Sequence, residues 1–176
     1  QFKGREKELV LKTLESTFVS SVGEFVDQFE RRLAEFTGAR FAVATSSGTA
    51  ALHTSLILAG ATRDDEVLVP SLSFVATANA VTYTGALPHF VDCDETTFGV
   101  DPERLEIYLR EIAEVRAGIC YNKHTGRRIA AVIAVHVFGH PCQIHAIAEI
   151  AARFQLTLID DAAESLGTTY QGRHTG

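Results

Sequence analysis

Apolar residues follow two different periods along the chain. Over residues 7–17 and 23–36 they recur at helical spacing, which predicts two amphipathic helices. Further on, short apolar runs alternate with longer helical stretches, a pattern typical of buried parallel strands and crossover helices. The predicted strands are 41–45, 66–70, 87–92, 131–136 and 156–160, and the predicted helices between them are 49–59, 73–83, 101–115 and 144–154. This alternation indicates an α/β fold with a mostly parallel sheet between two helical layers.

One segment interrupts the alternation before the fourth predicted strand. Residues 118–128 hold the run Asn-Lys-His-Thr-Gly between apolar flanks, which predicts a small β-hairpin insertion. Asp101 and Pro102 give the preceding helix a capping side chain and a first-turn proline. We expect two parts along the chain, the amino-terminal helices of residues 1–37 and the α/β part of residues 38–176.

Composition narrows the class of protein. The chain has 176 residues, 46% of them hydrophobic and 22% charged, which is typical of a globular protein with its own core. Its 16 basic residues are scattered and its net charge is −6, which argues against nucleic-acid binding. No run of 18 apolar residues occurs, and residues 1–12 lack the apolar centre of a secretory signal. With three widely spaced cysteines, these features predict a cytoplasmic protein without a membrane partner.

The loop after the first predicted strand is a candidate anion site. In open α/β sheets, ligands collect at the carboxyl ends of the strands. There, Ser46, Ser47, Gly48 and Thr49 open a predicted helix, whose first N–H groups and dipole would face a phosphate. The run matches neither the dinucleotide-binding glycine motif nor a P-loop. A well-capped helix that binds no ligand is the alternative.

Adjacent carboxylates end the last predicted strand. Asp160 and Asp161, with Glu164 shortly after, stand at the mouth of an apolar strand, where desolvation of a charge is costly. Such groups usually meet a cation, a metal or a ligand nitrogen, and one carboxylate there would hold a pyridinium nitrogen protonated. The alternative is that the two aspartates only cap the turn that follows.

Two further segments belong to the same edge of the predicted sheet. Phe74, in the loop after the second predicted strand, either offers a flat face for a ring to stack on or belongs to the core. The segment from His136 to His145 holds three imidazoles and the Cys142 thiol. Its spacing fits no metal motif, because a glycine and a proline break the helix that a paired-histidine site needs. We therefore expect no metal and keep His136 as a candidate wall residue.

The order of these segments is more specific than any one of them. With its small-residue turn, aromatic loop and strand-end Asp-Asp-Ala-Ala-Glu, the chain resembles the fold-type I, pyridoxal-phosphate-dependent sugar aminotransferases of the DegT/StrS family. The matching segments are 22–25, 47–52, 73–79, 91–94, 136–139 and 161–164. Within the family, 17–23 and 121–128 look most like enzymes that aminate UDP-4-keto-6-deoxy-N-acetylhexosamines.

The resemblance implies a role for each candidate residue. Gly48 and Thr49 would bind the phosphate of pyridoxal 5'-phosphate (PLP) through their backbone N–H groups, and Phe74 would stack on its pyridine ring. Asp161 would pair with the ring nitrogen, and Glu164 would approach the ring hydroxyl. The residues assigned to the sugar-nucleotide side of the pocket are Ser20, Ser21, Val22, Asn79 and His136.

The lysine that holds PLP in this family has no counterpart among the 176 residues. The family places it in a serine-rich segment beyond the Asp-Ala-Ala-Glu strand, whereas the lysines of this chain are Lys3, Lys7, Lys12 and Lys123. By resemblance, residues 38–176 would form part of the PLP-binding large domain, with the lysine expected beyond Gly176 and the small carboxyl-terminal domain absent. We expect such a chain to be inactive alone.

The resemblance also implies a reaction and partners. A homodimer would transfer an amino group, from a donor such as glutamate, to a 4-keto-6-deoxy sugar nucleotide in bacterial surface-glycan biosynthesis. Two alternatives stay open. One is a PLP-dependent sugar dehydratase that has histidine in place of the lysine, and the other is a non-catalytic fragment or binding module of the same fold.

Overall fold

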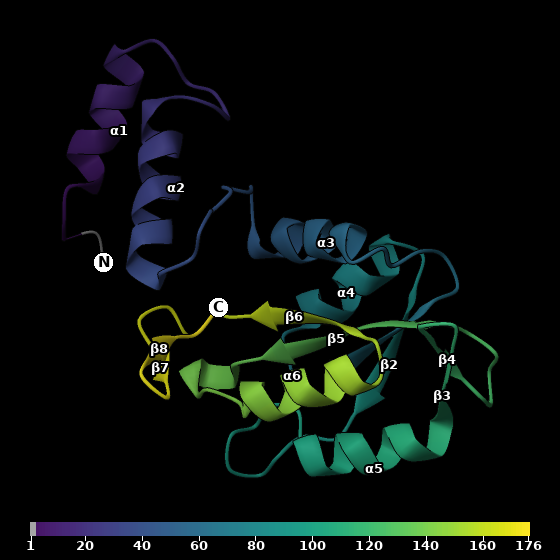
Figure 1. Ribbon diagram of the computed structural model, residues 1–176. Coiled ribbons are helices and arrows are strands. Elements are labelled where there is room, and N and C mark those ends of the chain that lie inside the picture. The colour runs from purple at the N-terminus through teal and green to yellow at the C-terminus, as the bar shows by residue number, and fades with distance from the viewer. Residues whose placement is uncertain (1–2) are drawn as a thin grey trace. The chain divides into compact units, whose positions relative to one another are not determined.

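The computed structural model describes residues 3–176, which divide into two compact units after Ala44. The first unit holds the two predicted helices, α1 (Glu6–Glu15) and α2 (Glu24–Thr37) (Figure 1). Helix α2 ends at Gly38, whose left-handed φ of 78° lets its N–H donate to the carbonyl of Ala34. No residue between 3 and 44 is fully buried, so this unit has no closed core of its own.

The predicted strand at 41–45 does not form. Its backbone pairs with no other strand of residues 3–176, and Phe41 and Val43 are 78% and 80% exposed. One of its amides, that of Ala44, donates instead to a side-chain oxygen of Glu30, 2.7 Å away. The prediction was wrong because an apolar run becomes a strand only when a neighbour takes its backbone N–H and C=O groups.

The second unit is a parallel sheet covered on both faces, as the sequence predicts. Its strands run in the order β2-β1-β5-β6, and α3 and α4 lie on one face with α5 and α6 on the other (Figure 1). The strands are β1 (Glu66–Pro70), β2 (Leu87–Val91), β5 (Ile129–Val135) and β6 (Thr157–Asp161). The helices are α3 (Gly48–Leu58), α4 (Val75–Tyr83), α5 (Pro102–Ile112) and α6 (Ile144–Arg153).

Strand β2 is less buried than expected. It pairs with β1 alone, and Leu87 and Phe90 are 41% and 57% exposed. Its apolar run predicted a strand that is buried throughout, but as the outermost strand of this sheet it is covered less completely than the central β1 and β5. Apolar composition therefore identified the strand but not its position in the sheet.

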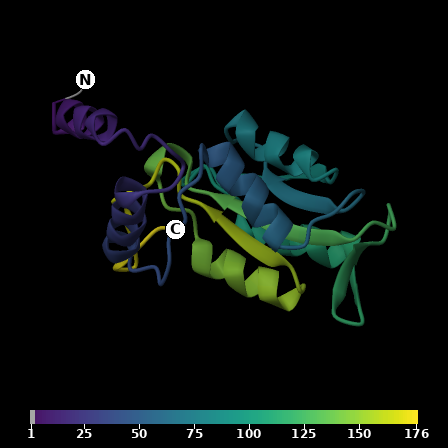
Figure 2. The ribbon, with the colours of Figure 1, turned by 90° about the horizontal axis from the view of Figure 1, so that it is seen from above.

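The predicted hairpin turn at residues 122–126 forms, and a second hairpin turn that was not predicted precedes it. Strands β3 (Ala113–Arg116) and β4 (Ile119–Asn122) are antiparallel and joined by Ala117 and Gly118, both with positive φ. The run Asn-Lys-His-Thr-Gly makes the next turn, where Tyr121 bridges to Arg128. Helix α5 accordingly ends at Ile112, three residues before its predicted end. In Figures 1 and 2 the hairpin lies beside the amino ends of the strands.

Alternating side chains of the strands build two separate cores. Leu68, Val132, Ala134 and Leu158 pack with residues of α5 and α6. The neighbouring positions face α3 and α4, and this second core contains Val67, Val69, Ile133, Val135, Ile159, Leu52, Leu56 and Val81. Two short strands, β7 (Thr169–Tyr170) and β8 (Arg173–His174), follow the sheet. Among the described residues, no helix is long and apolar enough to cross a membrane.

Candidate functional site

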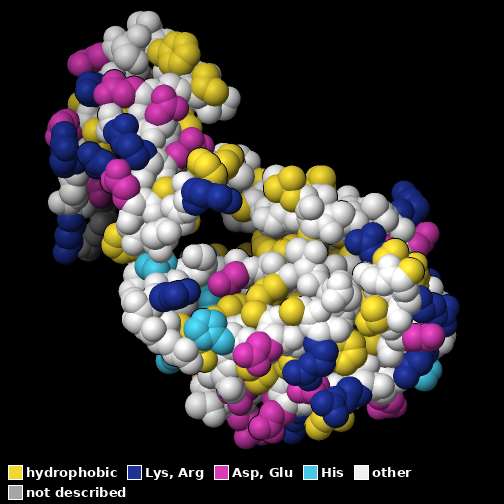
Figure 3. All heavy atoms as spheres, in the orientation of Figure 1, with side chains coloured by type: hydrophobic (Ala, Val, Ile, Leu, Met, Phe, Trp, Pro, Cys, Tyr) yellow, Lys and Arg dark blue, Asp and Glu magenta, His cyan; other side chains and the backbone are white. Residues whose placement is uncertain are grey.

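A cavity of about 440 Å³ opens at the carboxyl ends of β5 and β6, on the face of the sheet that α3 and α4 cover. Its lining comes from the start of α3, the loop before α4, the residues that follow β5, and the end of β6. The hollow lies under α3, and apolar side chains gather there (Figure 3). All five residues predicted to hold the cofactor line it: Gly48, Thr49, Phe74, Asp161 and Glu164.

The amino end of α3 supplies hydrogen-bond donors to this cavity. Ser47 caps the helix: its Oγ accepts from the N–H of Ala50 at 3.2 Å, and its carbonyl accepts from Ala51. The N–H groups of Gly48 and Thr49 precede the first helical hydrogen bond, so they stay available to a ligand. A Cβ added at Gly48 would meet no atom within 4 Å, which leaves the backbone open to close approach.

The ring of Phe74 is a wall of the cavity and not part of the core. Phe74 stands at the start of α4 and is 76% exposed, which decides between the two interpretations of its sequence position. The loop around it is held by a 2.8 Å hydrogen bond between the hydroxyls of Ser73 and Thr77. The N–H of Thr77 also donates to the carbonyl of Phe74, 3.0 Å away. The ring is thus free to stack on a planar ligand.

Asp161 brings a carboxylate to the opposite side of the cavity. It is the last residue of β6, and one of its oxygens accepts from the N–H of Ala163 at 3.2 Å. Burial raises the pKa of Asp161; the Ala163 hydrogen bond opposes this, and the charges of Asp160 and Glu164 add to it. No Lys, Arg or His side chain is among the residues that line the cavity. The site therefore favours a cationic group beside Asp161.

Glu164 is fixed at the rim by the loop that follows β5. Its Oε2 accepts from the N–H of Phe138 at 2.7 Å. Phe138 has a φ of 55°, which is unusual for a bulky residue, and a Cβ at Gly139 would lie 3.0 Å from the carbonyl oxygen of Glu164. The ring of Phe138 is 70% exposed and lines the cavity, although Phe138 is not among the predicted site residues. Its place in the loop after a buried strand is the signal that points to it.

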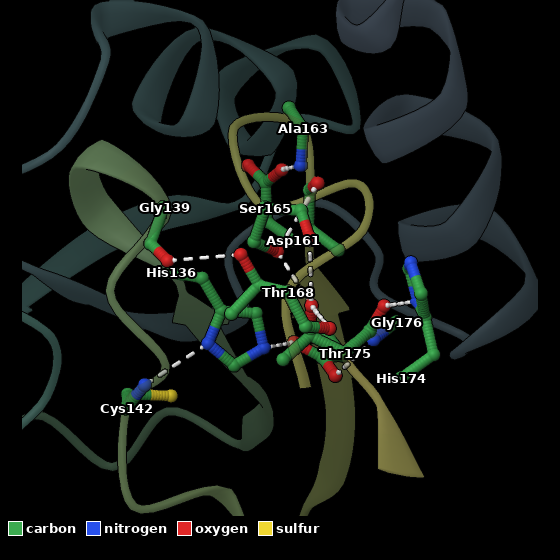
Figure 4. Close-up of polar contacts among 12 residues, drawn as sticks. His136, Gly139, Cys142, Asp161, Ala163, Ser165, Thr168, His174, Thr175 and Gly176 are labelled. Carbon is green, nitrogen blue, oxygen red and sulfur yellow. Dashed lines mark hydrogen bonds and ion pairs between the residues drawn. The ribbon is translucent and has the colours of Figure 1, made fainter. Parts of the chain in front are cut away.

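His136 does not form part of the cavity wall, contrary to expectation. Its side chain has no exposed surface, and it faces Asp160 and the backbone of Cys142 on the other side of β6 (Figure 4). A group without exposed surface cannot contact a substrate, so this assignment was wrong. Of the remaining substrate candidates, Asn79 is not among the lining residues, and Ser20, Ser21 and Val22 belong to the first unit. All four stay predictions.

None of the four lysines and none of residues 140–145 is among the residues that line the cavity. Lys123 follows β4 at the amino ends of the strands, away from the cavity, and the other three lysines belong to the first unit. His145 contacts Gln171 and the ring of Tyr170. Over residues 3–176, no group of three or more His, Cys, Asp or Glu residues is arranged to hold a metal ion.

Fold and cavity together define an α/β protein whose site offers unpaired N–H donors at a helix terminus and a carboxylate at a strand end. The profile of the DegT/DnrJ/EryC1/StrS aminotransferase family matches residues 1–176, and the chain belongs to this family. Over 173 residues it is 39% identical to GDP-perosamine synthase of Caulobacter vibrioides. The aligned residues make up 98% of this chain and 42% of that protein.

Two further comparisons agree. The putative pyridoxal phosphate-dependent aminotransferase EpsN of Bacillus subtilis is 36% identical over 173 residues, covering 98% of this chain and 42% of its own length. The X-ray structure of an aminotransferase from Psychrobacter cryohalolentis superimposes with a TM-score of 0.84 at 30% identity, over 100% of this chain and 41% of that one. The chain thus spans about two fifths of the length of the curated relatives it matches.

Proposed function

We propose that this chain forms the cofactor-binding part of a PLP-dependent aminotransferase that acts on a nucleotide-linked 4-keto-6-deoxy sugar. The observation that carries the proposal is the cavity in which the free N–H groups of α3 and the Asp161 carboxylate both lie. A phosphate and a pyridinium nitrogen are the two charged ends of PLP. The names of the relatives support the cofactor, through EpsN, and a sugar nucleotide, through GDP-perosamine synthase.

Each lining residue then has a chemical task. The N–H groups of Gly48 and Thr49 bind the phosphate, where the dipole of α3 favours a negative charge. Phe74 packs against one face of the ring and excludes water from it. Glu164, held by the N–H of Phe138, faces the ring hydroxyl. When bound, PLP supplies the electron-accepting ring that makes transfer of an amino group possible.

Asp161 keeps the proton on the ring nitrogen. Burial raises the pKa of Asp161, so a cationic ring nitrogen would offset the desolvation of its charge. The carboxylate and the protonated ring nitrogen then stabilise each other, and the ring remains a strong electron acceptor. This interaction gives Asp161 a larger share of the chemistry than any other residue of the cavity.

We also infer which residue holds PLP, which amino donor is used and how the subunits assemble. None of Lys3, Lys7, Lys12 and Lys123 serves as the lysine that holds PLP, and a lysine outside these 176 residues does so. Glutamate as amino donor, a homodimer and a cytoplasmic location rest on the family resemblance. The 176 residues alone should therefore bind PLP without covalent attachment, and borohydride treatment followed by mass spectrometry should find PLP on none of the four lysines.

Reconstitution of the full-length protein with PLP tests the function. We expect dialysis to leave PLP bound, and glutamate with a UDP- or GDP-linked 4-keto-6-deoxy sugar to yield the amino sugar. Asp161→Asn should nearly abolish this turnover, and His145→Phe, away from the cavity, should not. A wild-type protein that retains no PLP would overturn the proposal. Loss of a sugar hydroxyl without amination would identify a dehydratase instead.

A further inference from the structure

A buried polar cluster lies directly behind the cavity, on the other face of β6. The His136 ring has no exposed surface, and its Nδ1 accepts a hydrogen bond from the N–H of Cys142 at 3.0 Å (Figure 4). Because a donor already points at Nδ1, the proton of the ring sits on Nε2. This Nε2 lies 2.9 Å from Oδ1 of Asp160, and the contact is electrostatic, because neither atom makes a hydrogen bond with any described residue. The structure thus holds His136 with Nδ1 as a hydrogen-bond acceptor and with the Nε2 side of the ring facing Asp160.

The alternation of side chains along β6 makes this contact important for the cavity. Successive residues of a strand point to opposite faces of the sheet. Leu158 packs in the core beneath α5 and α6, and Asp160 points to the same face, whereas Ile159 and Asp161 point towards α3 and α4. A shift of β6 by one residue would exchange the two aspartates between cavity and core. Their identical side chains would not by themselves oppose such an exchange.

His136 contacts both aspartates, each in a different way. The register places Ala134 beside Asp160 and Val135 beside Asp161, and His136 continues β5 one residue further. Its backbone N–H donates to the carbonyl of Asp161 at 3.1 Å, while its ring faces the carboxylate of Asp160. The other oxygen of Asp160 accepts from the N–H of Gly176 at 3.2 Å. The carboxylate of Asp160 therefore accepts one hydrogen bond, from Gly176, and faces the His136 ring with its other oxygen.

We propose that His136 and Asp160 form a positioning pair that fixes the register of β6 and so keeps the Asp161 carboxylate turned into the cavity. This inference rests on the proposed function, because Asp161 must face the ring nitrogen of PLP for its orientation to matter. His136 itself touches neither cofactor nor substrate. It acts through Asp160 and through the backbone of Asp161.

The electrostatic surroundings are compatible with such a pair. The Cys142 thiol beside His136 stays neutral, since burial raises its pKa to about 12. On the cavity side, Asp161 and Glu164 are the charged side chains of the lining, and α3 and α4 contribute none. Asp161 thus receives no attractive charge from those helices. Its orientation depends on β6 and on the groups that hold β6 in place.

The first experiment examines the pair without cofactor. In the 176-residue chain labelled with 15N-histidine, long-range 1H–15N spectra should show His136 protonated at Nε2 and unprotonated at Nδ1. Asp160→Ala should broaden or shift these two signals, and it should leave those of His145 unchanged. Protonation of Nδ1 in the wild-type chain would overturn the proposal whatever the protein does with PLP.

The second experiment measures PLP affinity and the protonation of 15N-labelled PLP in the full-length protein. His136→Phe keeps a ring but loses both polar contacts, and we expect about tenfold weaker PLP binding and a pyridine nitrogen that loses its proton at lower pH. His136→Gln, which retains one acceptor and one donor, should restore both properties to near wild type. His145→Phe is the matched control and should change neither.

The outcomes separate the two proposals. If the wild-type protein binds no PLP, the proposed function fails, while the tautomer measurement still tests the pair. If the wild type binds PLP and the variants keep its affinity and its ring protonation, the proposed function stands and the positioning pair is wrong. Should His136→Phe fail to fold, Asp160→Ala decides instead, because that side chain is 27% exposed and its loss leaves no closed hole. Unchanged PLP properties in Asp160→Ala would overturn the inference.

Discussion

An ionised carboxylate on the wall of an apolar cavity lowers the free energy of unfolding unless a cation pairs with it. Asp161 is such a group, since burial raises its pKa and the nearby charges of Asp160 and Glu164 act in the same direction. A carboxyl group with a raised pKa in the folded state favours folding while it is protonated. That contribution is lost as the pH rises through the folded-state pKa. Asp161 therefore lowers stability at neutral pH in exchange for its interaction with PLP.

Asp161→Asn should thus stabilise the cofactor-free chain at pH 7. The amide has a similar shape and carries no charge, so the variant avoids the desolvation penalty that Asp161 has when ionised. At pH 4 the advantage should shrink, because the wild-type carboxyl is then increasingly protonated in the fold. Urea unfolding of both proteins at the two pH values measures the difference. Glu149→Gln on an exposed position of α6 is the control, and a destabilised Asp161→Asn at pH 7 would contradict the argument.

At the scale of single elements, local signals specify the start of two helices of the second unit, α3 and α5. Asp101 caps α5, and its Oδ1 accepts from the N–H groups of Glu103 and Arg104 at 2.9 and 3.1 Å. Pro102 follows in the first turn, where its missing N–H costs nothing. Ser47 caps α3 in the same manner. Because these contacts reach only two or three residues along the chain, the sequence alone reveals where such helices begin.

Asp101→Ala should lower the free energy of unfolding by about 1 kcal/mol, because two first-turn N–H groups lose their acceptor. Asp101→Asn retains an oxygen in the same place and should recover most of that loss. Chemical denaturation of the two variants and the wild type measures both effects. Equal stabilities of the wild type and both variants would show that the cap contributes nothing and that helix packing alone fixes the start of α5.

Strands and the hairpin were harder to predict because their partners are distant in sequence. The run at 41–45 has the composition of a strand, yet none of the described residues pairs with it. The hairpin turn that was not predicted lies at Ala117 and Gly118, where a positive φ at alanine is a feature that no sequence pattern marks. In the site, motif order predicted the five cofactor candidates, whereas the burial of His136 depends on its packing in the fold.

At the scale of the molecule, the ends of the sheet in the second unit have different chemistry. The carboxyl ends carry the cavity, and the amino ends carry a buried network centred on Glu66. Its carboxylate accepts from His89 at 2.8 Å, Asn122 at 2.9 Å and Thr125 at 2.6 Å. His89 also reaches the hydroxyl of Tyr108 at 2.8 Å. The network thus connects β1 and β2 with α5 and the hairpin.

Glu66→Gln should lower the free energy of unfolding by about 1–3 kcal/mol at pH 7. The Glu66 carboxylate accepts three hydrogen bonds, whereas the NH₂ group of a glutamine is a donor and would face one of the same donors. Burial by itself would raise the pKa of Glu66, but the hydrogen bonds from Thr125, Asn122 and His89 outweigh it and lower that pKa. The stabilisation is therefore present above the unfolded-state pKa and is lost as the pH falls through the folded-state value. Unfolding curves from pH 7 to pH 3 should show the two proteins converging. A constant difference would contradict this assignment.

The two units should also differ in local stability. Every residue of β5 is buried, whereas no residue between 3 and 44 is, and helices of 10 and 14 residues are marginal in water without tertiary packing. Hydrogen exchange of the 176-residue chain, followed by mass spectrometry, should show the amides of α1 and α2 exchanging at least about a hundredfold faster than those of β5. The amides of α6, packed on the sheet, serve as the helical control and should be protected. Protection of α2 equal to that of β5 would contradict the expectation. If that protection rose with protein concentration, contact with a second copy of the chain would be its source.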